Sequence, residues 1–210
     1  MKNNYLFFAN RSSPWSVGVL ALIQALALTG CMAGANTRFY SFASVRPSEM
    51  VPVAAARRSG VWVVGPVKLY EEIDRPQLVI RRSVSQVEIS ELDQWAVSLE
   101  QGISRLLIEA LGTQFPGRQL AAFPWTGREP VALRISPEVR QLSVTPGGEM
   151  VLTLVWALYD PKGDRLNRLE PQSYRQAAAA DIGPEQLVQG YRELLLQAVR
   201  DLAPRLKPYA

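Results

Sequence analysis

The 210-residue chain contains no histidine and only one cysteine, Cys31. Without histidine it lacks the usual general base at neutral pH and the commonest metal ligand in proteins. A single cysteine can form neither an intramolecular disulfide nor a thiolate cage for a metal. Catalytic systems that pair serine or cysteine with histidine are therefore excluded. We expect no metal site and no catalytic residues, since an enzyme would have to work with carboxylates, lysine or tyrosine alone.

An excess of basic charge is also missing from most of the chain. The net charge is +4, but Lys2 and Arg11 lie in a 30-residue N-terminal stretch that has no acidic residue. The remainder holds 21 basic and 19 acidic residues, and its basic residues come as short pairs such as Arg57-Arg58. Nucleic-acid binding requires a clustered basic face, so we expect no nucleic-acid partner.

Only one long apolar run is present, from Val17 to Leu28, and it is interrupted by Gln24 alone. A run of about 12 residues is too short to cross a bilayer and has the length of a signal-peptide core. Lys2 and Arg11 supply the positive flank that such a core requires. The pattern therefore predicts a targeting signal at the N-terminus.

The apolar run ends in Leu28-Thr29-Gly30-Cys31, which resembles the lipobox of bacterial lipoproteins. In such proteins the signal is cut before the cysteine, whose thiol carries a diacylglyceryl group and whose new amine is acylated. The resemblance implies a signal peptide at 1–30, a covalent lipid on Cys31 as the only attached group, and a tether at 31–37. Met32 follows rather than aspartate, which by the sorting rule of enteric lipoproteins implies the periplasmic face of the outer membrane. The alternative is a buried cysteine in an uncleaved anchor.

Two stretches carry apolar residues at the three- and four-residue steps of an amphipathic helix. The first helix is expected to begin near Ser90 and Asp93, which have capping-box spacing, and to stop at Gly112. The second is expected to begin at Pro184 and to end near Pro204. Both apolar stripes should face the core. They comprise Leu92, Trp95, Leu99, Ile103, Leu106 and Ala110 in the first helix, and Leu187, Tyr191, Leu194, Ala198 and Leu202 in the second.

The remaining patterns predict strands. Residues 150–159 are apolar on both faces, which is typical of a central strand, whereas 165–175 is polar and suits an edge. A change of phase predicts a bulge within 137–141. Strands, helix, strands and helix then follow one another, which predicts a layered α/β (α+β) domain over 38–206, with one mixed, largely antiparallel sheet carrying both helices. The other expected strands are 38–44, 61–69, 77–82, 84–89, 119–125 and 131–144, with a loop at 45–60.

The most distinctive stretch is LYEEIDRPQLVIRR, residues 69–82. Its Tyr70, its run Asp74-Arg75-Pro76-Gln77-Leu78-Val79 and its Arg81 resemble the signature of the ABC-type transport auxiliary lipoproteins, the PqiC-like family. Phe39-Tyr40-Ser41-Phe42 and the Trp95-Ala96 pair with Leu99 add to the resemblance, although Ser98 stands where that family has proline. The resemblance covers roughly residues 38–206.

The resemblance implies an accessory part of an MCE-type lipid transporter. An ABC transporter sits in the inner membrane, an MCE-domain protein forms a tunnel across the periplasm, and the lipoprotein docks from the outer membrane, in some members as a ring of identical subunits. Tyr70, Arg75 and Trp95 are residue types enriched at interface hot spots. They could equally serve the core, with Arg75 paired to Asp74 or another acid.

Two other classes of function stay open at this point. One is a lipoprotein scaffold of a different envelope machine, such as lipopolysaccharide assembly or the Tol system. The other is a lipid-anchored hydrolase, for which Glu71, Glu72 and Asp74 are the candidate acids. A paired-acid site needs two carboxylates facing each other across a cleft, so we expect these three to form a solvated turn.

Overall fold

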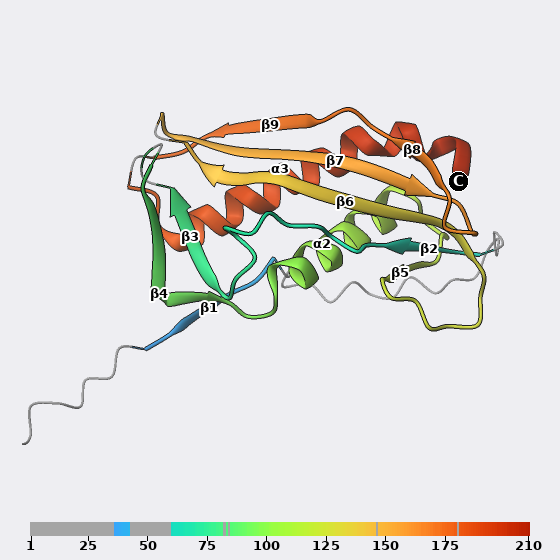
Figure 1. Ribbon diagram of the computed structural model, residues 1–210, viewed down its shortest axis with the longest axis horizontal. Coiled ribbons are helices and arrows are strands. Elements are labelled where there is room, and N and C mark those ends of the chain that lie inside the picture. Colours follow the sequence, from blue (N-terminus) through green and yellow to red (C-terminus); the bar gives the residue numbers. More distant parts are fainter. Residues whose placement is uncertain (1–35, 43–59, 82, 84, 146, 180) are drawn as a thin grey trace, which may run out of the picture. The chain divides into compact units, whose positions relative to one another are not determined.

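Nine strands and two long helices make up the part of the chain that the computed structural model describes, residues 36–42, 60–81, 83, 85–145, 147–179 and 181–210 (Figure 1). The expected signal peptide, the lipobox and nearly all of the loop at 45–60 lie outside these residues. Thr37–Ala210 forms one compact unit. In chain order the elements are β1 (Arg38–Tyr40), β2 (Val61–Val64), β3 (Gln77–Arg81), β4 (Val87–Trp95), α2 (Leu99–Gln114), β5 (Leu120–Ala122), β6 (Val131–Val144), β7 (Glu149–Tyr159), β8 (Arg165–Arg168), β9 (Gln172–Ala177), α3 (Pro184–Leu206) and the short 3-10 helix η1 (Lys207–Tyr209).

The larger sheet has the strand order β5-β2-β6-β7-β8, and β9 also pairs with β7. Strand β2 runs parallel to both β5 and β6, whereas β6 and β7 form a long antiparallel hairpin. Strands β9 and β8 share the other edge of β7, β9 along 149–154 and β8 along 157–159. The pairing of β6 with β7 shifts register between Val139 and Gln141, which confirms the bulge expected within 137–141.

A second, smaller sheet has the order β1-β4-β3, with β1 parallel and β3 antiparallel to β4. The register of β3 with β4 jumps from Val79 opposite Ile89 to Gln77 opposite Gln94. Two residues of β3 thus correspond to five of β4, so β4 carries a bulge of three extra residues. The sheet lies at one end of the molecule in Figure 1, beyond β6 and β7.

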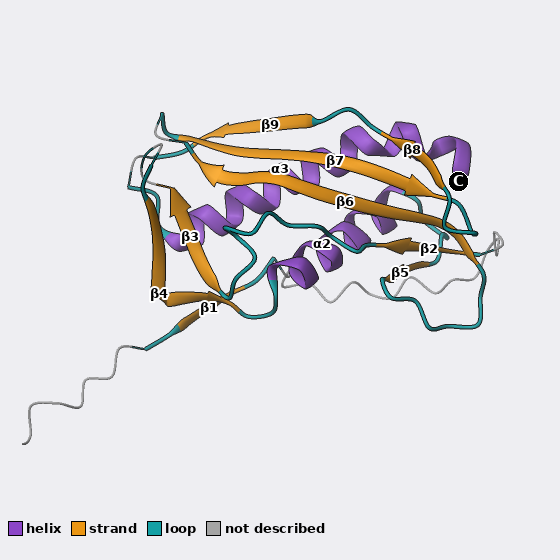
Figure 2. Cartoon of the chain, in the orientation of Figure 1, coloured by secondary structure: helices purple, strands orange, loops and turns teal. Residues whose placement is uncertain are grey.

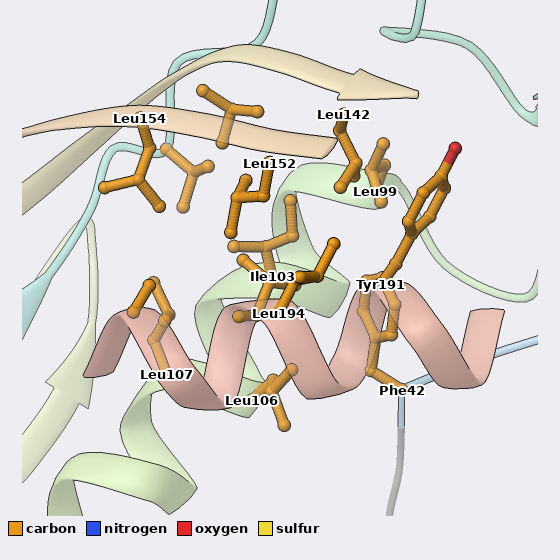
Figure 3. Packing of buried hydrophobic residues seen from close by; sticks show 14 of the residues in the cluster. Phe42, Leu99, Ile103, Leu106, Leu107, Leu142, Leu152, Leu154, Tyr191 and Leu194 are labelled. Carbon is orange, nitrogen blue, oxygen red and sulfur yellow. The ribbon is translucent and has the colours of Figure 1, made fainter. Parts of the chain in front are cut away.

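Both helices join the strands in one hydrophobic core. They contact each other, and α3 also contacts β7 and β9 while α2 contacts β5 and β2 (Figure 2). Figure 3 shows leucines of both helices meeting Leu142, Leu152 and Leu154 of the large sheet. Trp95 of the small sheet belongs to the same buried cluster, so the two sheets share one core.

At the centre of the other face of the large sheet, apolar side chains of β7 are also buried. Val151 and Val155 are 2% and 1% exposed, which confirms that β7 is a central strand with apolar residues on both faces. Their cross-strand neighbours on this face include Glu138, whose carboxylate binds Arg140 and Arg168 at 3.1 and 2.8 Å. Charged side chains therefore surround the small buried valines on this face.

Three expectations about the elements were wrong. The first helix begins at Leu99, and Leu92 and Trp95 belong to β4 instead. The apolar spacing continues backwards past the helix because β4 places Trp95 in the same core that the helix faces. The single sheet is two sheets, and the polar segment 165–175 is two strands, β8 and β9, both at an edge as expected.

Candidate functional site

Residues 69–76 of the distinctive segment lie in the connection from β2 to β3, and residues 77–81 are β3 itself. The Tyr70 hydroxyl donates a hydrogen bond of 3.2 Å to the carbonyl oxygen of Leu142 on β6. Burial of this side chain raises the pKa of Tyr70 to about 12, so it is a neutral donor at any physiological pH. Tyr70 therefore fastens the connection to the hairpin of the large sheet.

The Asp74-Arg75-Pro76-Gln77 run turns the chain into β3. The Arg75 amide donates to the Ile73 carbonyl at 2.9 Å, and the Trp95 amide donates to the Pro76 carbonyl at 2.7 Å. Gln77 then pairs with Gln94 in the small sheet. Proline fixes φ and biases the residue before it to extended geometry, which suits the entry to a strand.

The side chains of this run differ sharply in exposure. Asp74 and Pro76 are exposed, while Arg75 is half-buried and its Nε atom has no hydrogen-bond partner among the described residues. Trp95 is 8% exposed and packs on Phe42 with ring centroids 5.0 Å apart. The core alternative considered for Trp95 is thus what the structure shows.

Of the three clustered acids, Glu72 has a fixed partner. One guanidinium nitrogen of Arg81, Nη2, lies 2.6 Å from both carboxylate oxygens of Glu72, and hydrogen bonds between two charged groups are stronger than those between neutral ones. The pair ties the turn at 71–73 to the last residue of β3. Glu71 and Asp74 are exposed beside it, so the cluster belongs to a surface turn, with one acid used structurally.

A small cavity lies where the two sheets and the two helices meet. Trp95, Leu142 and Tyr191 are among its walls, and its volume is about 10 Å³. Space of this size suits a single water molecule and is far too small for an acyl chain. Tyr191 is 3% exposed, and its hydroxyl has no hydrogen-bond partner in the described part of the chain. Figure 3 shows this side chain rising from α3 beside Leu99 and Leu142.

A cluster of polar side chains surrounds Asp93 in the bulge of β4. Asp93 is 5% exposed, and its carboxylate accepts hydrogen bonds from Arg38 Nε at 2.7 Å and Arg38 Nη2 at 3.0 Å. It also accepts from the Tyr40 hydroxyl at 3.1 Å and the Ser90 hydroxyl at 2.7 Å. Burial alone would raise the pKa of Asp93, but these hydrogen bonds outweigh it and hold the pKa below its usual value.

This Asp93 cluster fastens β1, the first element after the expected tether, to the rest of the domain. Arg38 and Tyr40 belong to β1, whereas Ser90 and Asp93 belong to β4. The spacing of Ser90 and Asp93 predicts a helix start, but the structure places both residues in β4. The hydrogen bond from the Asp93 amide to the Ser90 hydroxyl, 3.0 Å long, is the local contact that such spacing favours, and here it forms inside a bulge.

The described residues contain no group of three or more histidine, cysteine, aspartate or glutamate side chains that could hold a metal ion. Within the same part of the chain, neither long helix has the length and apolar character that a bilayer crossing requires.

Fold and site together define a small mixed α+β domain whose first strand is clamped by a buried carboxylate. A family model, described as the ABC-type transport auxiliary lipoprotein component, matches residues 40–203. The chain therefore belongs to the ABC-type transport auxiliary lipoprotein family.

Solved structures share this fold at low sequence identity. The crystal structure of an uncharacterized protein matches with a TM-score of 0.63 and 17% identity, over 81% of this chain and 99% of that one. The crystal structure of a protein from Xanthomonas campestris matches with a TM-score of 0.58 and 14% identity, over 79% of this chain and 92% of that one. Among curated proteins no match was found.

Proposed function

We propose that this protein is a non-enzymatic, lipid-anchored accessory subunit of an MCE/ABC-type lipid transport system. In this proposal a lipid on Cys31 holds the domain at the periplasmic face of the outer membrane. The domain there docks a periplasmic MCE-domain protein and, through it, the inner-membrane ABC transporter. A ring of identical subunits is part of the proposal.

The observation that carries this proposal is the family match over residues 40–203, which covers almost all of the compact unit. The lipobox-like sequence that ends at Cys31 precedes that match by a few residues. The distinctive motif supports a non-catalytic role, because Tyr70, Glu72 and Arg81 are engaged in contacts that hold the fold. The cavity where the two sheets meet, about 10 Å³ in volume, is too small to hold an acyl chain.

The interface role of Tyr70, Asp74, Arg75, Pro76, Gln77, Arg81 and Trp95 stays a prediction. Asp74 and Pro76 are the members of this set with exposed side chains, so a partner would meet them first. The other five shape the connection that presents these two residues. A partner-binding variant should therefore alter Asp74 and leave Arg75 and Trp95 intact.

Native envelopes should be crosslinked and solubilised in mild detergent. This protein should then be captured from the extract, and the proteins captured with it identified by mass spectrometry. We expect an MCE-domain protein to be recovered, and its recovery to fall in Cys31→Ser because a lipid on Cys31 no longer holds the domain at the outer membrane. Recovery of lipopolysaccharide-assembly or Tol components without an MCE protein would overturn the transport role.

The same capture should be repeated with Asp74→Lys, matched by Asp164→Lys in the exposed turn before β8. We expect the first variant to lose the partner and the second to retain it, since both change charge equally at exposed sites. Equal recovery with both variants would place the docking surface away from the motif.

A further inference from the structure

Four large apolar side chains are exposed on the small sheet. Phe39 of β1 is 64% exposed, and Val87, Ile89 and Leu92 of β4 are 38%, 45% and 37% exposed. The other exposed large apolar side chains among the described residues, Phe123 and Leu166, belong to the part of the chain that builds the large sheet. Exposed apolar residues thus gather on two neighbouring strands at one end of the molecule (Figure 1).

The strand register places all four on a single face of the small sheet. Residues opposite each other on paired strands share a face, as do residues two apart along a strand. Phe39 is opposite Gln94, and Leu92 is two residues before Gln94. Gln94 is opposite Gln77, which shares its face with Val79 and Arg81. Ile89 and Val87 are opposite those two residues, so they complete the same face.

The three extra residues of the β4 bulge are what bring Leu92 to this face. Side chains alternate between faces with a period of two, so an odd insertion reverses the alternation. Without the bulge Leu92 would lie on the face opposite Ile89. The reverse face is the buried one near β1, where Tyr40 pairs with Trp95 and Arg38 with Asp93. The β1 and β4 part of this face therefore exposes the four apolar side chains, whereas Val79 of β3, on the same face by register, is 9% exposed and packs in the core.

This face begins only a few residues after Cys31 in the chain. Arg38 is seven positions after Cys31, and a fully extended chain spans at most about 25 Å over seven steps. Phe39 follows directly, and β1 is fixed to β4 by the Asp93 cluster. A lipid on Cys31 therefore keeps Phe39 and its neighbours within a short distance of the membrane surface.

We propose that the face formed by Phe39, Val87, Ile89 and Leu92 lies against the lipid surface in which the Cys31 lipid is inserted. The proposal rests on the lipid anchor of the proposed function and adds a second, protein-borne contact to it. Apolar side chains at a bilayer interface add binding energy in proportion to the apolar area they bury. The nearby charges favour a zwitterionic surface, since Asp93 neutralises Arg38 and Glu91 adds an exposed carboxylate to the bulge.

The test uses the full-length lipoprotein purified from membranes, with the lipid on Cys31 verified by mass spectrometry of the N-terminal peptide. It is reconstituted into phosphatidylcholine and phosphatidylethanolamine vesicles that contain phospholipids brominated in their acyl chains. Phe39→Trp and Leu92→Trp are reporters on β1 and β4, because bromine quenches tryptophan only at close range. Leu166→Trp on β8 is the matched control, since Leu166 is 48% exposed and β8 lies at the other end of the molecule (Figure 1).

We expect bromolipid to quench the added emission of both reporters several-fold more than that of Leu166→Trp, after subtraction of the wild-type signal. Quenching of Phe39→Trp alone would show that only the end of the tether touches lipid and would overturn the proposal. If neither bromolipid nor aqueous iodide quenches the two reporters, and if this protection is lost when the protein is diluted, the face binds a second copy of the chain and the proposal is overturned. An unmodified Cys31 would overturn the anchor itself, and with it this proposal.

Discussion

Asp93 shows how one side chain can join distant parts of a domain. It is a buried carboxylate that receives hydrogen bonds from Arg38, Tyr40 and Ser90, and two of these residues come from a strand more than fifty positions earlier. A buried charge is stable only when it is paired and hydrogen-bonded. Removing the charge should therefore loosen β1 before anything else.

We predict that Asp93→Asn lowers the free energy of unfolding at pH 7 by about 1–3 kcal/mol, because a charge-assisted acceptor is replaced by a neutral amide. The hydrogen bonds hold the folded pKa of Asp93 below the ordinary value, which is about 3.9 in an unfolded chain. The stability they contribute is fully present above that ordinary value and is lost as the pH falls through the lowered folded pKa.

Urea unfolding of the wild type and of Asp93→Asn between pH 7 and pH 2 measures both effects. The difference between the two proteins should narrow over the acid range as the wild-type carboxylate becomes protonated. A difference that stays constant with pH would show that ionisation of Asp93 contributes nothing to stability. Asp164→Asn, in an exposed turn, controls for the loss of a charge.

The start of α2 is the clearest case at the scale of the element. Ser98 is its N-cap, and its hydroxyl accepts a hydrogen bond of 3.3 Å from the Gln101 amide. Serine satisfies a free amide at a helix start, which proline cannot do. The position where the family resemblance led us to expect proline thus has its own local explanation.

We predict that Ser98→Ala destabilises the domain by about 0.5–2 kcal/mol, because the Gln101 amide loses its partner. Ser98→Asp should retain most of the stability, since aspartate is an equally good cap and also suits the positive end of the helix dipole. Thermal unfolding followed by circular dichroism compares the three proteins. Equal loss in both variants would mean that the hydroxyl is not acting as a cap.

The sequence predicts the periodic elements well and their ends poorly. Both helices and the central position of β7 follow from apolar spacing, because burial of one or both faces leaves a regular pattern. The assignment of Leu92 and Trp95 to a helix fails because Ser90 and Asp93 can hydrogen-bond each other in a bulge as well as in a cap. The pairing of β4 with β1 and with β3 distinguishes the bulge from the helix cap.

The sequence predicts which residues form the candidate motif but not which residues they contact. The motif around Tyr70 and Arg81 stands out in the sequence, but its contacts to Leu142 and Glu72 depend on how β3 and β6 meet. Nothing near Tyr191 in the sequence distinguishes its unpartnered hydroxyl from that of any other helical tyrosine. Long-range pairing therefore carries the information that local pattern lacks.

The whole domain is organised around the junction where both sheets and both helices meet. Leu142 of β6 is 1% exposed there, and it shares a small cavity with Leu78 of β3, Trp95 of β4 and Tyr191 of α3. The two sheets hence have no separate cores, and the described domain should unfold as one unit.

We predict that Leu142→Ala costs about 2–5 kcal/mol of stability, as truncation of a buried leucine leaves a cavity. Tryptophan fluorescence and far-ultraviolet circular dichroism should give coincident transitions in the wild type, and both should move together in the variant. Leu166→Ala, at an exposed position, should change stability by no more than about 0.5 kcal/mol. Transitions that separate in Leu142→Ala would show that the sheets fold independently.

The parallel pairing of β1 with β4 has a mechanical consequence. A pull on the chain ahead of Arg38, directed along β1, loads the hydrogen bonds between the two strands sideways, because those bonds run across the strands. The bonds of β1 and the two contacts from Arg38 to Asp93 then share the load at once. Tension directed along β1 must therefore shear the whole attachment, and does not peel it open one bond at a time.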